Sequence, residues 1–223
     1  MRKLNVLTFV SLDGVMQAPG GPHEDPTGGF KYEGWVAPLF DEALGEVMGE
    51  QTGKPFDLLL GRRTYDIFAA HWPYQDESEP FVKELNRATK YVASRSNPKL
   101  AWENSVLVSG DIPAKVRKIK EQDGPDIQVH GSSDMIQTLL KHDLIDEFWL
   151  KIFPVVLGKG KRLFGDGTVP ASFILRDSRT TPNGVIVATY ERAGEVQTGN
   201  FGSDTPSERE LARREKLKQE VAS

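Results

Sequence analysis

The sequence contains no cysteine among its 223 residues. It therefore has no disulfide framework, no thiolate ligand for a metal ion and no cysteine nucleophile. It also has no apolar run near the roughly 18 residues that a membrane span requires. The segment after Met1 lacks the apolar core and cleavage site of a signal peptide. These absences predict a cytoplasmic protein with no membrane partner.

Charge of one sign is not concentrated anywhere in the chain. The net charge is −4 at pH 7 and no long basic stripe is visible, which argues against nucleic acid as a partner. The four histidines show no metal-ligand spacing, so no metal site is expected. The glycine pattern G-x-G-x-x-G is missing as well, which argues against an ordinary Rossmann domain.

Strand-like and helix-like patterns alternate through most of the chain. The apolar runs predict strands at residues 4–10, 57–60, 90–93, 106–108, 127–129 and 148–152, and then a hairpin that pairs 173–179 with 185–191. This order predicts an α/β fold with a mixed, mostly parallel sheet flanked by helices and antiparallel strands at its C-terminal edge. We expect one domain over residues 1–193.

The segment 194–223 has a different composition, because charged residues are common in it and large apolar residues are sparse. Thr205 to Glu208 resembles a capping box with proline at the first helical position, so residues 206–221 are expected to form a helix. Its few apolar residues favour a solvated or frayed helix over a coiled coil.

Three strand ends carry residues suited to binding phosphate. The segments Gly61-Arg62-Arg63-Thr64, Ser94-Arg95-Ser96 and Gly131-Ser132-Ser133 each follow an expected strand. In a parallel sheet these ends share the carboxyl edge, where α/β proteins bind ligands. Helix N-termini attract anions, and arginine matches phosphate oxygens. Each segment alone also fits a bland role, as a βα junction, a polar loop or a helix N-cap. Together they predict an extended site for a dinucleotide.

Five short motifs occur in the order found in a known family. They are Ser11-Leu12-Asp13-Gly14, Leu60-Gly61-Arg62-Arg63-Thr64-Tyr65, Val92-Ala93-Ser94-Arg95, Val129-His130-Gly131-Ser132-Ser133 and Pro154-Val155-Val156-Leu157-Gly158-Lys159-Gly160. Over about residues 2–192 the chain resembles the dihydrofolate-reductase-like proteins, which include the reductase domain of bifunctional riboflavin-biosynthesis enzymes. The resemblance implies an NADPH-dependent reductase, usually a homodimer.

The resemblance also implies roles for individual residues. Val10, Ser11, Gly14 and Val15 would lie near the nicotinamide. Phosphates would be held by Gly61, Arg62, Arg63 and Thr64, the 2′-phosphate would lie beside Ser94, Arg95 and Ser96, and the pyrophosphate would be bound by Gly131, Ser132, Ser133, Asp134 and Met135. Many relatives have glycine where Ser132 stands, often after a cis peptide. Serine there leads us to expect a trans bond or a shifted loop.

The substrate side has weaker signals. Residues 16–34 are rich in glycine and proline and form a connection longer than usual, which is typical of a functional loop or a disordered segment. A helix is expected to begin at Pro38. By resemblance, Asp41 falls near the carboxylate that assists protonation, although a first-turn aspartate stabilised by the helix dipole is slightly favoured. Trp35 could stack on a substrate ring or belong to the core.

These inferences lead to one functional hypothesis and one rival. The protein is expected to transfer hydride from NADPH to a planar nitrogen heterocycle, either a pterin of the dihydrofolate type or a ribosylamino-pyrimidine such as 5-amino-6-(5-phosphoribosylamino)uracil. The rival is a non-catalytic nucleotide-binding protein that has lost its substrate site. A carboxylate and an apolar slot for a ring, both facing the nicotinamide, would favour the reductase.

Overall fold

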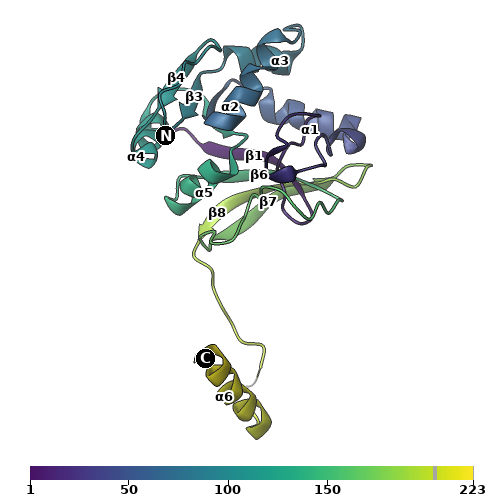
Figure 1. The fold of residues 1–223 in the computed structure, drawn as a ribbon, viewed down its shortest axis with the longest axis vertical. Helices are drawn as coiled ribbons and strands as arrows, with labels where there is room; N and C mark the ends of the chain where they lie inside the picture. Colours follow the sequence, from purple (N-terminus) through teal and green to yellow (C-terminus); the bar gives the residue numbers. More distant parts are fainter. Residues whose placement is uncertain (203–204, 223) are drawn as a thin grey trace.

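The computed structural model describes residues 1–202 and 205–222. An eight-stranded sheet has the order β4-β3-β2-β5-β1-β6-β8-β7 (Figure 1). The strands are β1 (Leu4–Ser11), β2 (Phe56–Gly61), β3 (Lys90–Ala93), β4 (Ser105–Val108), β5 (Asp126–Val129), β6 (Glu147–Phe153), β7 (Ser172–Thr180) and β8 (Ile186–Gly194). Strands β1 to β6 pair with one another in parallel, and β8 pairs antiparallel with both β6 and β7. The predicted fold class is confirmed.

The central strands are buried on both faces, as their continuous apolar runs predict. Every residue of β2 is buried. Because side chains alternate across a strand, Leu59 packs on one face of the sheet while Leu58 and Leu60 pack on the other. This two-sided burial is what a layer of helices on each face requires.

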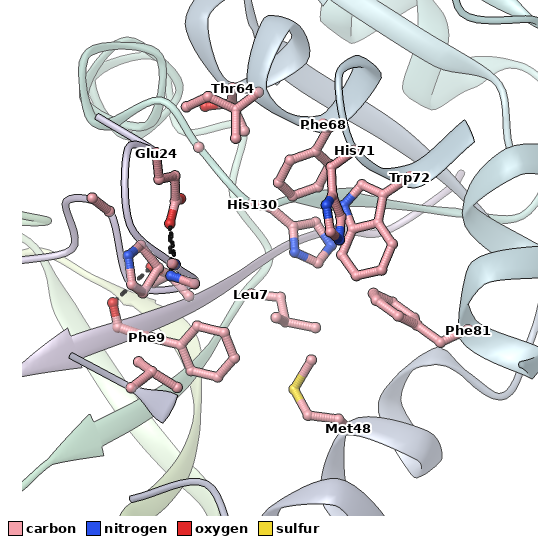
Figure 2. Close-up of a pocket in the computed structure, with 18 of the residues that line it drawn as sticks. Leu7, Phe9, Glu24, Met48, Thr64, Phe68, His71, Trp72, Phe81 and His130 are labelled. Atoms are coloured by element: carbon pink, nitrogen blue, oxygen red, sulfur yellow. Dashed lines mark hydrogen bonds between the residues drawn. The ribbon is translucent and has the colours of Figure 1, made fainter. Parts of the chain in front are cut away.

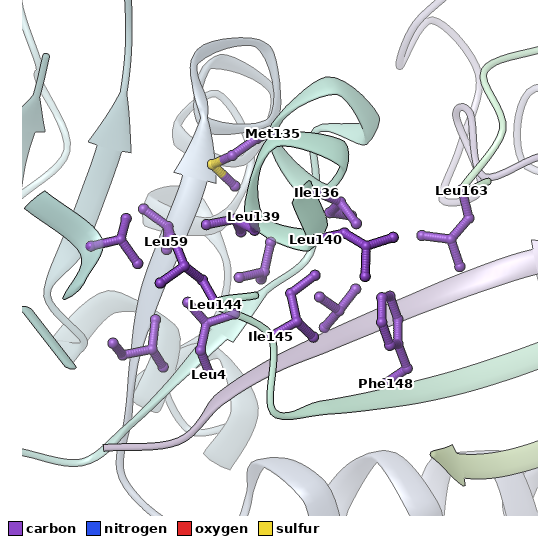
Figure 3. Close-up of a cluster of buried hydrophobic side chains, with 14 of the residues drawn as sticks. Leu4, Leu59, Met135, Ile136, Leu139, Leu140, Leu144, Ile145, Phe148 and Leu163 are labelled. Atoms are coloured by element: carbon purple, nitrogen blue, oxygen red, sulfur yellow. The ribbon is translucent and has the colours of Figure 1, made fainter. Parts of the chain in front are cut away.

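The two faces carry different helices. The helices α4 (Ile112–Glu121) and α5 (Ser133–Lys141) cover one face, where Leu139 and Ile136 pack against Leu4 and Leu59 (Figure 3). The opposite face is covered by α1 (Glu42–Thr52), α2 (Arg62–Ala69) and α3 (Pro80–Arg87). That face holds two separate apolar clusters. The cavity described below is lined by residues that pack on both of them.

The helix expected from Pro38 begins later. Ala37–Leu39 forms a short 3₁₀ turn, and Phe40 is extended at φ −75° and ψ 113°. Asp41 is then the N-cap of α1, and its Oδ1 accepts the Leu44 N–H at 2.9 Å. The expectation was wrong by one turn because a side chain that caps a helix must lie outside it.

The antiparallel hairpin of β7 and β8 is confirmed, with Gly184 at φ +79° in its turn. Beyond β8, the helix α6 (Glu208–Ala222) lies away from the sheet (Figure 1). Its apolar residues Leu211, Leu217 and Val221 are exposed, as a solvated helix predicts. Ser203, Asp204 and Ser223, which belong to the expected tail, lie outside the described residues.

Candidate functional site

The three strand ends expected to bind phosphate lie side by side. Strands β3, β2 and β5 are adjacent and parallel, so the segments that begin at Ser94, Gly61 and His130 leave the same carboxyl edge. This part of the sequence prediction is confirmed. The edge continues through β1 and β6, which are parallel neighbours as well.

Two glycines let the ends of β2 and β5 approach closely. The Gly61 N–H donates to the Gly131 carbonyl at 3.1 Å. A Cβ on Gly61 would lie 2.9 Å from the Ser132 nitrogen, and one on Gly131 would lie 2.6 Å from Thr64 Oγ1. The Gly131–Ser132 peptide is cis, so the expected trans bond is wrong. The Ser132 side chain lies directly against Gly61, since a Cβ on Gly61 would be 2.4 Å from Ser132 Oγ.

The helices that begin at these ends have no side-chain cap. Gly61 is the N-cap of α2 and has no side chain, and the N-cap of α5, Ser132, makes no capping hydrogen bond. The first-turn N–H groups and the Ser132 hydroxyl are therefore open to an anion. Thr64 and Ser133 stand beside them on the wall of the same cavity.

A cavity of about 1570 Å³ extends from this edge along the sheet face that carries α1, α2 and α3. Leu7 and Phe9 of β1 form part of its lining, and Met48 of α1 lies opposite them (Figure 2). Residues 16–25 of the long loop line one side. The strand ends that carry residues suited to phosphate and an apolar chamber thus belong to one continuous cavity.

Aromatic side chains form the wall of this chamber beside α2 and α3. Phe68, His71, Trp72 and Phe81 gather there (Figure 2). The Trp72 ring lies 4.9 Å from His71 and 5.2 Å from Phe81, both edge to face. We call these four residues the aromatic wall. Such a surface offers ring faces and edges for packing against a planar molecule.

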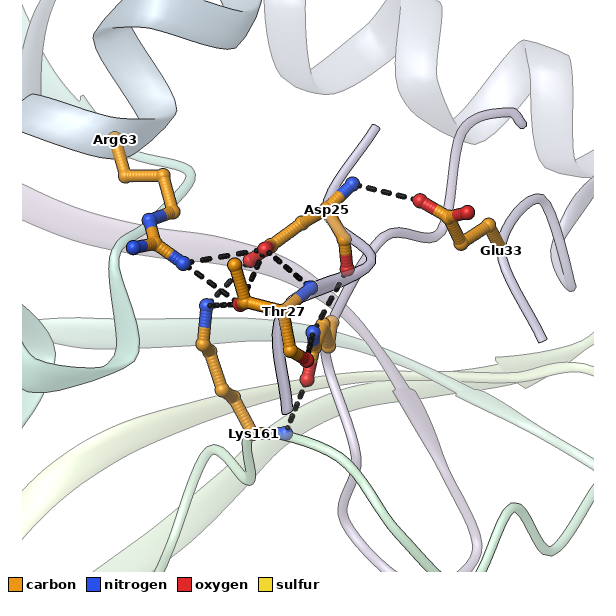
Figure 4. Close-up of polar contacts among 6 residues, drawn as sticks. Asp25, Thr27, Glu33, Arg63 and Lys161 are labelled. Atoms are coloured by element: carbon orange, nitrogen blue, oxygen red, sulfur yellow. Dashed lines mark hydrogen bonds and ion pairs between the residues drawn. The ribbon is translucent and has the colours of Figure 1, made fainter. Parts of the chain in front are cut away.

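The loop 16–34 is held by an ion network around Asp25 (Figure 4). Arg63 Nη1 lies 3.2 Å from Asp25 Oδ1, Lys161 Nζ pairs with Oδ2, and the Thr27 hydroxyl donates to Oδ1. Burial raises the pKa of the Asp25 carboxyl, but the hydrogen bonds from Lys161 and Thr27 outweigh it and hold the pKa below its usual range. The network fastens the loop to α2 and to the segment after β6.

The neighbouring carboxylate behaves differently. Glu24 lines the cavity, and its Oε2 accepts the Gly20 and Gly21 N–H groups at 2.6 and 3.2 Å. Burial raises the pKa of Glu24 and outweighs those two hydrogen bonds, with further repulsion from Asp25 and Glu33.

A lysine is buried below the cavity. The Lys151 side chain on β6 is fully buried, and its ammonium donates to Gln51 Oε1. Desolvation lowers the pKa of Lys151 to about 7. His130 lines the cavity and bonds Gln128 Oε1 at 3.2 Å. Burial, helped by the charge of Lys151, lowers the pKa of His130 to about 3, so its imidazole is neutral.

The residues expected to bind the cofactor fall into two groups. Arg63, Thr64, Gly131, Ser132 and Ser133 line the cavity. The others do not; they are Val10, Ser11, Gly14, Val15, Gly61, Arg62, Ser94, Arg95, Ser96, Asp134 and Met135.

Several members of the second group are engaged elsewhere. Arg62 pairs with Asp66 one turn along α2 at 2.7 Å. The Ser11 hydroxyl donates to Asp13 at 2.6 Å and accepts the Val15 N–H. The Ser94 hydroxyl lies 3.2 Å from that of Ser96. These contacts keep Arg62 and Ser11 turned to their own segments.

Asp41 and Trp35 also lie outside the cavity lining. Besides capping α1, the Asp41 carboxylate accepts the Asn183 N–H at 2.9 Å through Oδ2. Desolvation raises the pKa of Asp41, but the hydrogen bonds from Asn183 and Leu44 lower it by more. The pKa of Asp41 is therefore below its usual value. Trp35 is buried, donates from Nε1 to the Gln17 carbonyl at 2.9 Å, and packs edge to face on Phe153. Their contacts match the structural alternatives stated for both residues.

Residues 1–202 and 205–222 contain no group of three or more histidine or acidic side chains placed to hold a metal ion. None of the helices in those ranges is both long and apolar enough to cross a membrane.

The sheet order and the cavity at its carboxyl edge define a dihydrofolate-reductase-like fold of the reductase type. Solved structures share it: a protein from Shewanella described as a riboflavin biosynthesis protein is 23% identical, with a TM-score of 0.60 and coverage of 86% of this chain and 99% of that one. A pyrimidine reductase-like protein from Corynebacterium diphtheriae is 14% identical, with a TM-score of 0.57 and coverage of 87% and 93%. Dihydrofolate reductase from Enterococcus faecalis is 12% identical, with a TM-score of 0.55 and coverage of 85% and 96%.

The chain belongs to the RibD C-terminal domain family, whose model matches residues 2–187. Two Bacillus subtilis relatives are uncharacterised proteins. YyaP is 31% identical over 140 residues, which cover 61% of this chain and 74% of YyaP. YwjB is 28% identical over 186 residues, which cover 80% of this chain and 91% of YwjB.

Sequence reasoning missed the loop carboxylates, Lys161 and the aromatic wall. A visible signal was the acidic pair Glu24-Asp25 inside a loop rich in glycine and proline, because adjacent carboxylates in such a loop need partners from elsewhere. Nothing in the sequence pairs Asp25 with Lys161, which is 136 positions away.

Proposed function

We propose that this protein is an NADPH-dependent reductase that acts on a planar nitrogen heterocycle. The observation that carries the proposal is the single cavity that joins a phosphate-type strand edge to an aromatic wall. Family membership supports a reductase, and the dihydrofolate reductase of similar fold was solved with NADP(H). When bound, the cofactor would supply hydride, while the protein would bind and orient both reactants.

The residues at the strand edge suit a phosphate-bearing cofactor. Arg63 presents a guanidinium, Thr64, Ser132 and Ser133 present hydroxyls, and the first turns of α2 and α5 present uncapped N–H groups. This donor set favours anions. In the same proposal, Gly61 lets Ser132 come close to β2 beside the phosphates. Asp134 and Met135 border the pyrophosphate, Ser94, Arg95 and Ser96 lie beside the adenosine 2′-phosphate, and Val10, Ser11, Gly14 and Val15 border the nicotinamide.

The chamber beyond this edge suits the substrate. The aromatic wall, Phe9 and Met48 give it an apolar surface. A pterin or a ribosylamino-pyrimidine has the planar ring that such a surface accepts. The rival hypothesis of a protein without a substrate site is disfavoured, because both the apolar slot and a carboxylate, Glu24, are present on the cavity wall.

We further propose a cytoplasmic homodimer. Strand β7 ends the sheet, and Ile174 and Leu175 on it are about half exposed. An apolar edge strand of this kind is normally covered by another chain or element.

Fluorescence titration with NADPH and NADH tests the proposal. We expect tighter binding of NADPH, and we expect Arg63→Gln to weaken NADPH binding by roughly one to two decades, the loss typical of a charge-assisted hydrogen bond. Arg62→Gln is the matched control, because Arg62 is paired with Asp66 outside the cavity. Equal dissociation constants for the two cofactors, or no binding of either, would refute the cofactor assignment. Binding without oxidation of NADPH by any pterin or aminopyrimidine would favour the rival.

A further inference from the structure

The cavity has a second end, between α1 and α3, away from the strand ends that carry residues suited to phosphate. The two helices lie side by side, and both line the space, with residues that include Gly45, Met48, Gly49, Phe81 and Glu84. Figure 2 shows Met48 and Phe81 at this end of the chamber. In the proposed function the phosphates of the cofactor lie at the strand ends, so the space between α1 and α3 remains for the substrate. We call it the α1–α3 arm.

Two glycines open the α1 side of this arm. Gly45 and Gly49 are four positions apart, so they lie on the same face of the helix. Glycine inside a helix lowers stability relative to alanine, and neither glycine has a positive φ that would require it. A Cβ on Gly49 would have no heavy atom within 4 Å, and one on Gly45 would meet only the Phe40 ring, at 3.7 Å. Packing within the protein therefore does not explain these glycines, whereas a ligand group that lies against the helix backbone does.

Carboxylates predominate on the α3 side of the arm. Three carboxylates and one ammonium line it; they are Glu77, Glu79, Glu84 and Lys83. Among the described residues, two further lysine or arginine side chains line the cavity, Arg63 and Lys161, and both pair with Asp25 of the loop. An anionic group in the arm would therefore meet three like charges and one cation.

The N-terminus of α3 does not supply the missing positive charge. Glu79 is the N-cap of this helix, and Pro80 is its first residue. Proline has no N–H group to donate, and Glu79 brings a negative charge of its own to the positive end of the helix dipole. A phosphate or carboxylate group of a ligand gains little at this position.

We propose that the substrate places its ring substituent in the α1–α3 arm, and that this substituent carries no phosphate or carboxylate group. The substrate class is then a heterocycle with a polyhydroxylated or amine-bearing substituent, whose O–H or N–H groups donate to the carboxylates of α3. This inference rests on the proposed function and narrows it, because a ribosylamino-pyrimidine would enter without a phosphate and a pterin without the glutamate of dihydrofolate. Like charges in a partly enclosed space repel more strongly than in bulk water, which disfavours the anionic forms.

Three pterins that share one ring system test the charge part of the proposal with the full-length protein. Pterin has no substituent, neopterin has a neutral trihydroxypropyl group, and neopterin phosphate adds a phosphate to that group. Saturating NADP⁺ fills the strand ends, so that the phosphate of the ligand cannot bind there. Isothermal titration calorimetry at low ionic strength should give a dissociation constant at least about 10-fold higher for neopterin phosphate than for neopterin.

Two variants show whether the carboxylates of α3 cause this difference. Glu84→Gln should reduce the difference between neopterin and neopterin phosphate by at least about threefold. Glu121→Gln removes the same charge from the exposed end of α4, on the opposite face of the sheet, and should leave the difference unchanged.

Substitutions in α1 test where the substituent lies. Gly49→Leu fills the arm and should weaken neopterin binding at least about 10-fold, but pterin binding less than about threefold. Glu46→Leu places the same side chain on the exposed face of α1, and should leave both affinities unchanged. Gly49→Ala should raise the melting temperature by about 2–4 °C, because alanine favours the helix and nothing in the protein obstructs its Cβ.

Several outcomes would overturn the assignment. They are equal or tighter binding of neopterin phosphate by the wild type, equal losses for pterin and neopterin in Gly49→Leu, and a lower melting temperature in Gly49→Ala, since the fold itself would then require the glycine. Absence of pterin binding beside bound NADP⁺ would overturn the substrate class while the cofactor assignment stands. Failure of the wild type to bind NADP⁺ would instead refute the proposed function itself.

Discussion

The buried lysine below the cavity allows a stability prediction whose size follows from the structure. Lys151 is fully buried, and its pKa falls from 10.5 to about 7 because of desolvation. Each pKa unit corresponds to about 1.4 kcal/mol, so burying this lysine costs about 4–5 kcal/mol at pH 7 relative to the unfolded chain. Replacement by methionine, which has a similar shape and no charge, removes that cost.

The gain is reduced by the partner that is left behind. Lys151 donates to Gln51 Oε1, and an unsatisfied amide costs about 1–3 kcal/mol. We therefore expect Lys151→Met to raise the free energy of unfolding by about 2–4 kcal/mol at pH 7. Urea unfolding followed by circular dichroism measures this difference.

The pH dependence gives a second measurement of the same effect. Between pH 7 and 10.5 the unfolded chain binds a proton at Lys151 that the folded protein does not, so wild-type stability rises with pH in this window. From pH 7 to 9.5 the free energy of unfolding of the wild type should rise by about 3 kcal/mol through this lysine. In Lys151→Met it should be absent, so the two proteins converge at alkaline pH.

A second buried lysine serves as the matched control. Lys120 pairs with Asp146 and donates to the Leu144 carbonyl at 2.9 Å, so Lys120→Met breaks a pair and should destabilise the protein. If Lys151→Met is less stable than the wild type at pH 7, or if it keeps the wild-type pH slope, the reasoning about its desolvation is refuted.

Three further predictions concern other parts of the chain. Asp41→Ala should lower stability by about 1 kcal/mol through the lost N-cap and leave NADPH affinity unchanged; a hundredfold loss of turnover in Asp41→Asn, tested on an active heterocycle, would restore the catalytic role. Truncation after Gly194 should shift the melting temperature by no more than a few degrees, because the apolar residues of α6 are exposed; a collapse in stability would show that the tail packs on a partner. Light scattering should give twice the 24.8 kDa chain mass, and a monomer mass would contradict the dimer.

The fold was largely readable because its signals are local. The run Leu58 to Leu60 is apolar throughout, and burial on both faces of β2 is its direct consequence. The hairpin was visible from alternating side chains around Asn183-Gly184. The start of α1 was misjudged because Pro38 suits a first helical turn and a 3₁₀ turn equally well. Whether Pro38 begins the helix or lies in a 3₁₀ turn depended on Asp41 and its contact with Asn183, 142 positions away.

The site was only partly readable because its contacts are long-range. Parallel pairing brings the three phosphate-type segments to one edge, and that follows from strand order alone. The orientation of each side chain does not follow. Arg62 and Arg63 are adjacent and chemically equal, yet Arg62 turns along α2 to Asp66 while Arg63 faces the cavity and Asp25. Helical geometry separates neighbours by about 100°, so two adjacent arginines leave the helix in different directions.

Long-range contacts also explain why two adjacent carboxylates have opposite pKa shifts. Asp25 and Glu24 share one loop, but the pKa of the first is lowered and that of the second is raised. The difference comes from partners: Asp25 faces Arg63 and Lys161, whereas Glu24 faces the cavity with one oxygen open. A carboxylate that is neutralised by two fixed cations is suited to fastening the loop. Because Asp25 fixes the loop, the position of Glu24 on the cavity wall depends on the contacts of Asp25.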